Sequence, residues 1–335
     1  MRGVGAAVVL VSVLVIAPRP GARAQSAAAP IRLDLPIRCR LGETCVVQQY
    51  FDHDPGPGAA DYRCGPMVYD GHDGTDFRVP SVADQKRGVD VLAAAAGEVR
   101  GVRDGMIDQD IRIAGAASVR DRECGNGVLL THADGWETQY CHMARGSVRV
   151  RPGQTVTAGQ VLGRVGESGD AAFPHVHLSV RHGGVKVDPF AWAEPSGPCG
   201  GGRSLWSAEA ARALAYRSPD LLNAGFSPRA LTSAEVEAGE PLGPVEASSA
   251  ALVVYVRLIG LKAGDDPQLV LSGPNGEVLA RTASQPMPRN RAEQYLMVGK
   301  RLRSGRWPAG RYEGHLEVRR AGAPVLSRQF SMSIS

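Results

Sequence analysis

Histidine and aspartate side chains that can share a metal ion are concentrated in the first part of the chain. Seven of the eight histidines precede residue 183. Imidazole and carboxylate groups are typical zinc ligands in proteins, so their spacing is informative. The relevant patterns are Gly71-His72-Asp73-Gly74-Thr75-Asp76, Tyr140-Cys141-His142 and Pro174-His175-Val176-His177.

The His175-Val176-His177 pattern reads as part of a β-strand. Side chains alternate between the two faces of a strand, so both imidazoles point the same way, about 7 Å apart, while Val176 points into the packing. Two imidazoles at this separation can serve one site in two different roles.

His72 and Asp76 require a bend if they are to act together. In a straight strand their Cα atoms would lie about 13 Å from each other. They can hold one ion only if the chain turns between them, and we expect Gly71 and Gly74 to supply that bend. Two imidazoles and one carboxylate, with a fourth position left open, are typical of a catalytic zinc site.

The sequence around Asp134-Gly135 predicts a β-hairpin with a two-residue turn, in which Ala133 faces Trp136. In that register His132 and His142 lie on opposite faces, so they cannot both enter one pocket. We therefore expect His132 to be a hydrogen-bonded structural residue. Outside this hairpin, two further histidines are expected to do no chemistry: His53, solvated in a loop, and His182, in a turn.

Together these patterns resemble the lysostaphin-type zinc endopeptidases, known as the M23 or LytM peptidase family. H-x-x-x-D, Y-x-H and H-x-H occur in the family's order, and the surrounding segments GTDF, VLAAAAGEVRGV, GNGVLLTHADG and VRPGQTVTAGQVLGRVG are also similar. The resemblance covers about residues 65–192. The chain departs from the family pattern by a long stretch, Arg103 to Arg122, which is a candidate border of the substrate groove.

The resemblance implies a site and a reaction. It assigns His72, Asp76 and His177 as ligands of Zn²⁺, and His142 and His175 as catalytic histidines that do not bind the metal. Since the chain has no H-E-x-x-H glutamate, histidine would have to move the protons near neutral pH. The family's substrates imply hydrolysis of peptide bonds in peptidoglycan cross-links. The alternatives are a non-catalytic cell-wall scaffold or amidase activator with the same fold, and a zinc peptidase that acts on proteins.

The N-terminus has the pattern of a secretory signal peptide. A cationic start precedes an uncharged run from Val4 to Ala17, and Ala22-Arg23-Ala24 predicts cleavage after residue 24. The run is shorter than the roughly 20 residues of a membrane span, and no later segment approaches that length. We therefore expect an exported protein, periplasmic or secreted, with no membrane span after removal of the leader.

Six cysteines, at positions 39, 45, 64, 124, 141 and 199, favour disulfides in an exported chain. There is no C-x-x-C pair, which argues against a zinc ribbon. The hairpin register places Cys141 opposite Val128, about 13 Å from Cys124 along the strand. Because a disulfide needs Cα atoms within about 7 Å, we expect no Cys124–Cys141 bond unless the strand curls.

Short strands separated by glycine and Asp-Gly turns predict a mainly β protein. We expect a signal peptide at 1–24, an entry segment at 25–64, and a barrel-like or sandwich-like peptidase domain at 65–195. A linker with a helix near Ser207–Tyr216 would follow at 196–244, and a small immunoglobulin-like β-sandwich at 245–335. In the peptidase domain the expected strands are Val89–Ala94, Gly97–Val102, Val128–His132, Thr138–His142, Val161–Val165, Val176–Arg181 and Val185–Asp188.

Composition limits the partners. The formal charge of +4 includes three arginines of the leader, which leaves about +1. A nearly neutral chain with 5% aromatic residues lacks the features of a nucleic-acid-binding protein. The C-terminal region has a single histidine, His315, and no cysteine, so we expect a binding or positioning module there, or a lid over the first domain, with no partner assigned.

Overall fold

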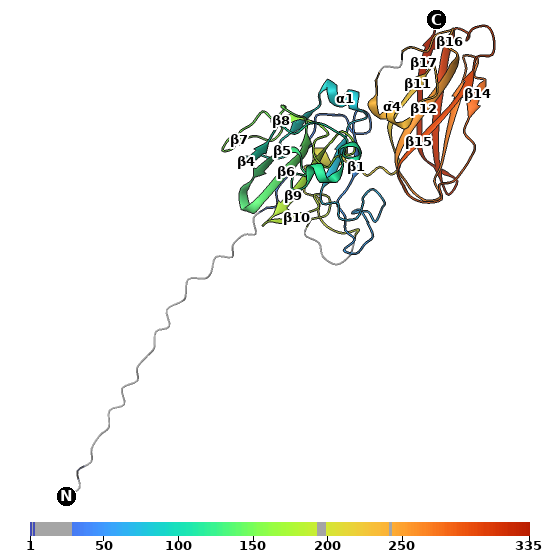
Figure 1. The fold of residues 1–335 in the computed structure, drawn as a ribbon. Coiled ribbons are helices and arrows are strands. Elements are labelled where there is room, and N and C mark those ends of the chain that lie inside the picture. The colour runs from blue at the N-terminus through green and yellow to red at the C-terminus, as the bar shows by residue number, and fades with distance from the viewer. Residues whose placement is uncertain (2, 4–28, 193–198, 241–242) are drawn as a thin grey trace. The chain divides into compact units, whose positions relative to one another are not determined.

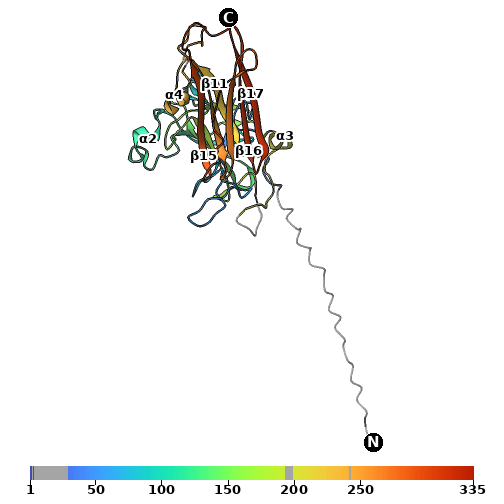
Figure 2. The ribbon, with the colours of Figure 1, turned by 90° about the vertical axis from the view of Figure 1, so that its right-hand side faces the viewer.

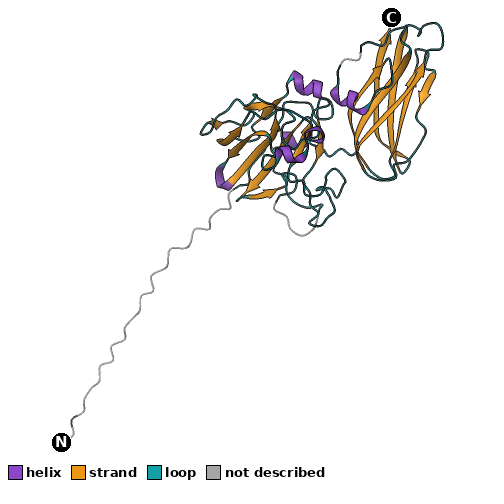
Figure 3. Cartoon of the chain, in the orientation of Figure 1, coloured by secondary structure: helices purple, strands orange, loops and turns teal. Residues whose placement is uncertain are grey.

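The computed structural model describes residues 1, 3, 29–192, 199–240 and 243–335 (Figure 1). Strands dominate these residues, and the helices are short (Figure 3). The expected signal peptide, apart from residues 1 and 3, lies outside them. Across the described residues, no helix has the length and apolar character needed to pass through a membrane.

An antiparallel sheet forms the framework of the first domain. Within the described residues it has eight strands, in the order β1-β2-β9-β6-β5-β4-β7, with β10 paired to β9. A separate pair joins β3 (Asp90–Leu92) to β8 (Val161–Arg164). The strands of the large sheet are β1 (Val46–Gln49), β2 (Thr75–Arg78), β4 (Gly97–Arg103), β5 (Asn126–Thr131), β6 (Trp136–Met143), β7 (Thr155–Val156), β9 (His175–His182) and β10 (Val185–Val187).

The strands expected between residues 89 and 188 are confirmed as β3, β4, β5, β6, β8, β9 and β10. Strands β1, β2 and β7 were not expected. The alternation expected for β9 is also present, since Val176, Leu178 and Val180 all belong to the hydrophobic core. Burial of this apolar row holds the opposite row of side chains, which begins with His175, on the other face of the strand.

The helical segments are peripheral. The expected helix near 207–216 is present but shorter, as α3 (Ala208–Ala213), and the Ser207 side chain caps it by accepting from the Ala210 N–H. Residues 103–122 contain α2 (Ile111–Ala114) and a 3₁₀ turn, η1 (Ala116–Val119). The remaining helical elements are α1 (Val82–Arg87), α4 (Ser233–Ala238) and the 3₁₀ turn η2 (Ala133–Gly135).

The hairpin between β5 and β6 corrects our expected register by one residue. Its loop is η2, three residues long, and the His132 N–H donates to the Trp136 carbonyl, so Val128 pairs with Tyr140. Two left-handed residues, Asp134 (φ 55°) and Gly135 (φ 75°), accommodate the extra loop residue. The face assignment was therefore wrong: His132 shares a face with Thr138, whose hydroxyl it contacts at 2.8 Å.

The condition under which we allowed a Cys124–Cys141 bond, a curl in the strand, is met. The two residues form a disulfide with Cα atoms 4.8 Å apart. The strand does curl: a bulge interrupts the β5–β6 pairing between Asn126 and Val128, and Gly125 adopts a left-handed φ of 63°. The other disulfides among the described residues are Cys39–Cys45 and Cys64–Cys199.

The C-terminal region contains two further antiparallel sheets (Figure 2). Buried side chains from both sheets, among them Leu252, Leu269 and Leu316, form a single hydrophobic cluster. Strand β11 pairs with β12 although it lies within residues 196–244, where we expected a linker. One sheet comprises β11 (Asp220–Ser227), β12 (Ala251–Leu261) and β15 (Arg291–Arg301), and the other β14 (Val278–Arg281), β13 (Asp266–Ser272), β16 (Gly310–Arg320) and β17 (Ala323–Ile334).

A buried cluster of charges joins β2 to residues of α4, β12 and β15. Arg78 and Arg257 are both almost fully buried. The Glu237 carboxylate lies 2.5 Å from the Arg78 guanidinium and 2.7 Å from that of Arg257, and Glu293 lies 2.7 Å from Arg78. Burial alone would raise the pKa of Glu293, but the two arginines outweigh it and hold the pKa below its ordinary value.

We expect Glu237→Gln to lower the free energy of unfolding by about 3 kcal/mol, because two buried guanidinium groups would then share one carboxylate. Glu240→Gln is the matched control, since Glu240 pairs with Lys86 at a site where both side chains are more than 60% exposed. Its expected effect is below about 0.5 kcal/mol. Urea unfolding of both variants measures the difference, and equal losses would contradict the assignment.

Candidate metal centre

His72 precedes β2 and is fixed by the end of β1. Its Nδ1 donates to the Tyr50 carbonyl at 2.6 Å, so its Nε2 is the nitrogen that carries the lone pair. The ring is buried. The expected bend is confirmed in part: Gly71 has a left-handed φ of 77°, and His72 Nε2 reaches Asp76 Oδ1 at 3.2 Å.

Gly74 does not supply the bend that we expected, and a glycine is needed there for another reason. Its φ is not in the left-handed region, but a Cβ at this position would collide with the His177 ring and the Leu178 carbonyl. Gly74 is therefore needed because β9 passes so close to it.

His177 arrives on β9 directly opposite Asp76 of β2 in the antiparallel register. Its Nε2 contacts the Ser179 hydroxyl at 2.9 Å and lies 3.3 Å from the Asp73 carboxylate, so that nitrogen is the donor. Its Nδ1 consequently presents a lone pair to Asp76 Oδ1, 2.8 Å away. Hydrogen bonds of this kind behind a metal-binding histidine orient the ring and select the tautomer.

Three electron-pair donors thus converge: His72 Nε2, His177 Nδ1 and Asp76 Oδ1. The first two are 3.2 Å apart, and each lies within 3.2 Å of the carboxylate oxygen. Zinc–ligand bonds of 2.0–2.1 Å in a tetrahedron would separate two ligands by about 3.3 Å. The triangle therefore fits one small cation, and these residues form a candidate metal-binding group.

The Asp76 carboxyl is held in its ionised form. Burial alone would raise its pKa, but the neighbouring His72, His175 and His177 side chains, whenever they carry a proton, stabilise the carboxylate more strongly and hold the pKa well below the ordinary value. An ionised carboxylate between two neutral imidazoles is the form that binds a divalent cation.

His142 and His175 lie beside this group. The Nδ1 of His142 donates to the Ser168 carbonyl and that of His175 to the Phe173 carbonyl, both at 2.8 Å. Their ring centres are 4.6 Å apart. Burial lowers the pKa of both rings, and that of His142 falls well below the ordinary value. Each is thus a neutral ring that keeps an Nε2 lone pair.

A cavity of about 290 Å³ is lined by three of these residues, His72, His142 and His177. Its wall carries charges of both signs, including an ion pair between Lys186 and Asp73. None of residues 103–122, the stretch that we expected to border the substrate groove, lines this cavity, although Glu123 and Cys124 directly after it do. The lining residues are Tyr69, Gly71, His72, Asp73, Glu123, Cys124, Gln139, Cys141, His142, Asp170, His177, Ser179, Arg181 and Lys186.

Three other histidines lie elsewhere. His132 is hydrogen-bonded to the Ala96 carbonyl at 2.7 Å and to Thr138, which confirms the structural role expected for it. His53 is not solvated as we expected, because its side chain is 18% exposed and contacts Asp188 at 2.7 Å. His182 is the last residue of β9 and stacks on Trp136.

Sequence reasoning missed the groups that orient the donors. Ser179 and Asp73 hold His177, and the Ser168 carbonyl holds His142. A signal for Ser179 was present, since it lies two residues after His177 and therefore on the same face of the strand. Ser168 gave no such signal, because it acts through its backbone.

Comparison with known protein families points to the same part of the chain. The sequence pattern of "Peptidase family M23" matches residues 70–189, which include all five of these histidines and aspartates. This part of the chain belongs to peptidase family M23. The family resemblance stated from the sequence is thereby confirmed.

Relatives of the M23 domain include cell-wall enzymes. The DD-carboxypeptidase/endopeptidase Mpg of Neisseria meningitidis is 34% identical over 114 residues, or 32% of this chain and 23% of the relative. The peptidoglycan DD-endopeptidase ShyC of Vibrio cholerae is 27% identical over 103 residues, or 31% of this chain and 22% of the relative. The chain spans less than a quarter of the length of these curated relatives.

A solved structure, a zinc-containing peptidase from Vibrio cholerae, is 22% identical and covers 49% of this chain and 40% of its own. Its TM-score is 0.32, which is too low to establish a shared overall fold.

We expect Gly74→Ala to weaken zinc binding by about 10- to 100-fold, because the new methyl group must displace the His177 ring. Gly101→Ala is the control, since no atom lies within 4 Å of its Cβ position. Competition with a chromogenic chelator measures both affinities. Unchanged affinity in Gly74→Ala would contradict the close approach of β9.

Proposed function

We propose that this chain is an exported zinc metalloendopeptidase that hydrolyses peptide bonds in peptidoglycan cross-links. The observation that carries the proposal is the convergence of the His72, Asp76 and His177 donor atoms beside two further neutral histidines, with His72, His142 and His177 lining one cavity. A purely structural cluster would not need three lone pairs directed at one point.

The donor set favours zinc. Two imidazoles and one carboxylate suit Zn²⁺, and three protein ligands leave the fourth tetrahedral position for water or substrate. When bound, zinc supplies a Lewis acid that makes water acidic enough to ionise near neutral pH and polarises a peptide carbonyl. Asp76 balances part of the charge of the ion.

His142 and His175 are proposed to move the protons. Each ring is anchored through Nδ1, so its Nε2 can accept a proton from the attacking water, or donate one to the departing amine once charged. Their lowered pKa values keep both rings neutral, and hence ready to accept a proton, at neutral pH.

The substrate class rests on the relatives, since one is named a peptidoglycan DD-endopeptidase and another a DD-carboxypeptidase/endopeptidase. The cavity is compatible with a short peptide that carries charges of both signs, because Glu123 and Asp170 contribute acidic groups and Arg181 and Lys186 basic ones.

Export is supported by the cysteines. All six are paired in disulfides, which persist in oxidising compartments such as the bacterial periplasm or the medium. For the C-terminal region we propose an immunoglobulin-like sandwich, since sheets of three and four described strands enclose one core.

Purified sacculi are the direct substrate for a test. We expect release of soluble fragments that stops when zinc is removed by a chelator and resumes when zinc is restored. His177→Ala should lose both the metal and the activity. His142→Ala should keep about one zinc per chain and lose activity by about 10²- to 10⁴-fold.

His182→Ala is the control, because His182 lies at the far end of β9, the strand that carries His177. This variant should retain both zinc binding and activity. Tight zinc binding without hydrolysis in the native protein would favour the scaffold or activator role. Digestion of proteins without fragment release from sacculi would favour a protein substrate. Full activity in His142→Ala would contradict the role given to that residue.

A further inference from the structure

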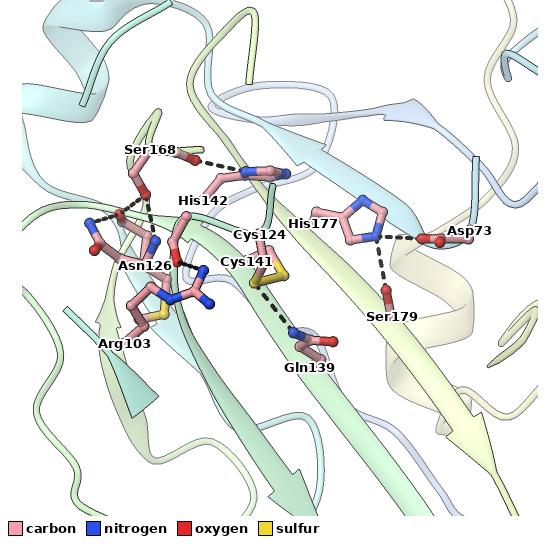
Figure 4. The surroundings of a disulfide bond; sticks show 12 residues. Asp73, Arg103, Cys124, Asn126, Gln139, Cys141, His142, Ser168, His177 and Ser179 are labelled. Carbon is pink, nitrogen blue, oxygen red and sulfur yellow. Dashed lines mark hydrogen bonds and ion pairs between the residues drawn. A yellow bond between two sulfur atoms is a disulfide. The ribbon is translucent and has the colours of Figure 1, made fainter. Parts of the chain in front are cut away.

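The Cys124–Cys141 disulfide lies in the wall of the catalytic cavity. Both cysteines line it together with His142 and His177. Cys141 pairs with His177 across the β6–β9 ladder and directly precedes His142 in the chain. Figure 4 shows the disulfide near His142, His177 and Gln139. The Gln139 side-chain amide donates to Cys124 Sγ at 3.4 Å.

His142 has an unusual backbone conformation. Its φ is +60°, in the left-handed region that disfavours residues with a Cβ. Such a conformation persists at a functional site only when surrounding contacts hold it there. The conformation matters because it sets the direction of the imidazole, whose Nδ1 meets the Ser168 carbonyl.

The disulfide and a hydrogen bond hold this conformation jointly. The His142 N–H donates to the Cys124 carbonyl at 2.8 Å. The acceptor therefore belongs to the residue that is covalently tied to Cys141, the neighbour of His142. A closed ring results: Cys124, the disulfide, Cys141, the His142 amide, and the hydrogen bond back to Cys124.

The Ser168 carbonyl, which accepts from the His142 imidazole, is positioned by separate hydrogen bonds. The Ser168 hydroxyl accepts from the Asn126 N–H at 2.9 Å (Figure 4). It also donates to the Met143 carbonyl at 2.7 Å. These bonds position the acceptor for the imidazole but do not fix the backbone of His142 itself. That task falls to the ring that contains the disulfide.

We propose that the Cys124–Cys141 disulfide is a positioning device for the imidazole of His142, in addition to being a covalent staple. The inference rests on the proposed catalytic role of His142. Neither Cys39–Cys45 nor Cys64–Cys199 lines the cavity, so those bonds lack this function.

The test compares Cys124→Ala/Cys141→Ala with Cys39→Ser/Cys45→Ser, each in the full chain loaded with zinc. In the first variant we expect about one zinc per chain, KM within twofold of the native value, and kcat at least tenfold lower. The His142 amide, followed by NMR hydrogen exchange, should exchange at least tenfold faster. The control should keep kcat and the protection of the His142 amide.

Native kcat in the first variant, measured well below its melting temperature, would overturn the proposal, and so would unchanged exchange at His142. Loss of zinc, or an equal fall of kcat in the control, would show a general structural role and overturn it as well. Cys124→Ala/Cys141→Val is the second variant. If neither variant folds, the disulfide has a general structural role, and the proposal is overturned. If the native protein hydrolyses nothing, the proposed function fails, while amide exchange still decides the positioning claim.

Discussion

The central constraint in this protein is the close approach of three buried electron-pair donors. Their lone pairs repel one another unless a cation lies between them. His72 Nε2, His177 Nδ1 and Asp76 Oδ1 approach within 2.8–3.2 Å, and hydrogen bonds already occupy the outer nitrogen of each ring. Neither ring can supply a proton to the centre without losing its outer bond. A metal ion between them would resolve this conflict, and three protein ligands would leave one position free for chemistry.

The sheet makes that convergence possible. Pairing of β2 with β9 sets Asp76 opposite His177, and pairing of β9 with β6 sets His177 opposite Cys141, next to His142. Since the inner face of β9 is a continuous apolar row, a slip of one residue would turn the histidines into the hydrophobic core and turn the apolar side chains toward the site. The hydrophobic core therefore specifies the register, and the register assembles the site. The loops add only fine orientation through the Tyr50, Phe173 and Ser168 carbonyls.

Much of this was predictable from the sequence, and the failures have physical causes. Alternation identified most strands of the first domain and placed His175 and His177 on one face. It could not determine the hairpin loop, because Asp-Gly supports loops of two or three residues, and one residue changes every cross-strand pair. Strand β15 carries only a weak sequence signal, because Val298 is its only β-branched residue. The Cys124–Cys141 bond depends on a bulge, which no periodic pattern reveals.

Anomalous diffraction at the zinc edge, from crystals of the zinc-loaded protein, tests the central claim most directly. The account predicts a single strong peak about 2.0–2.1 Å from His72 Nε2, His177 Nδ1 and a carboxylate oxygen of Asp76, with His142 and His175 outside bonding distance. A peak bound by other residues, or an absence of zinc at this position in a protein that binds it elsewhere, would contradict the account.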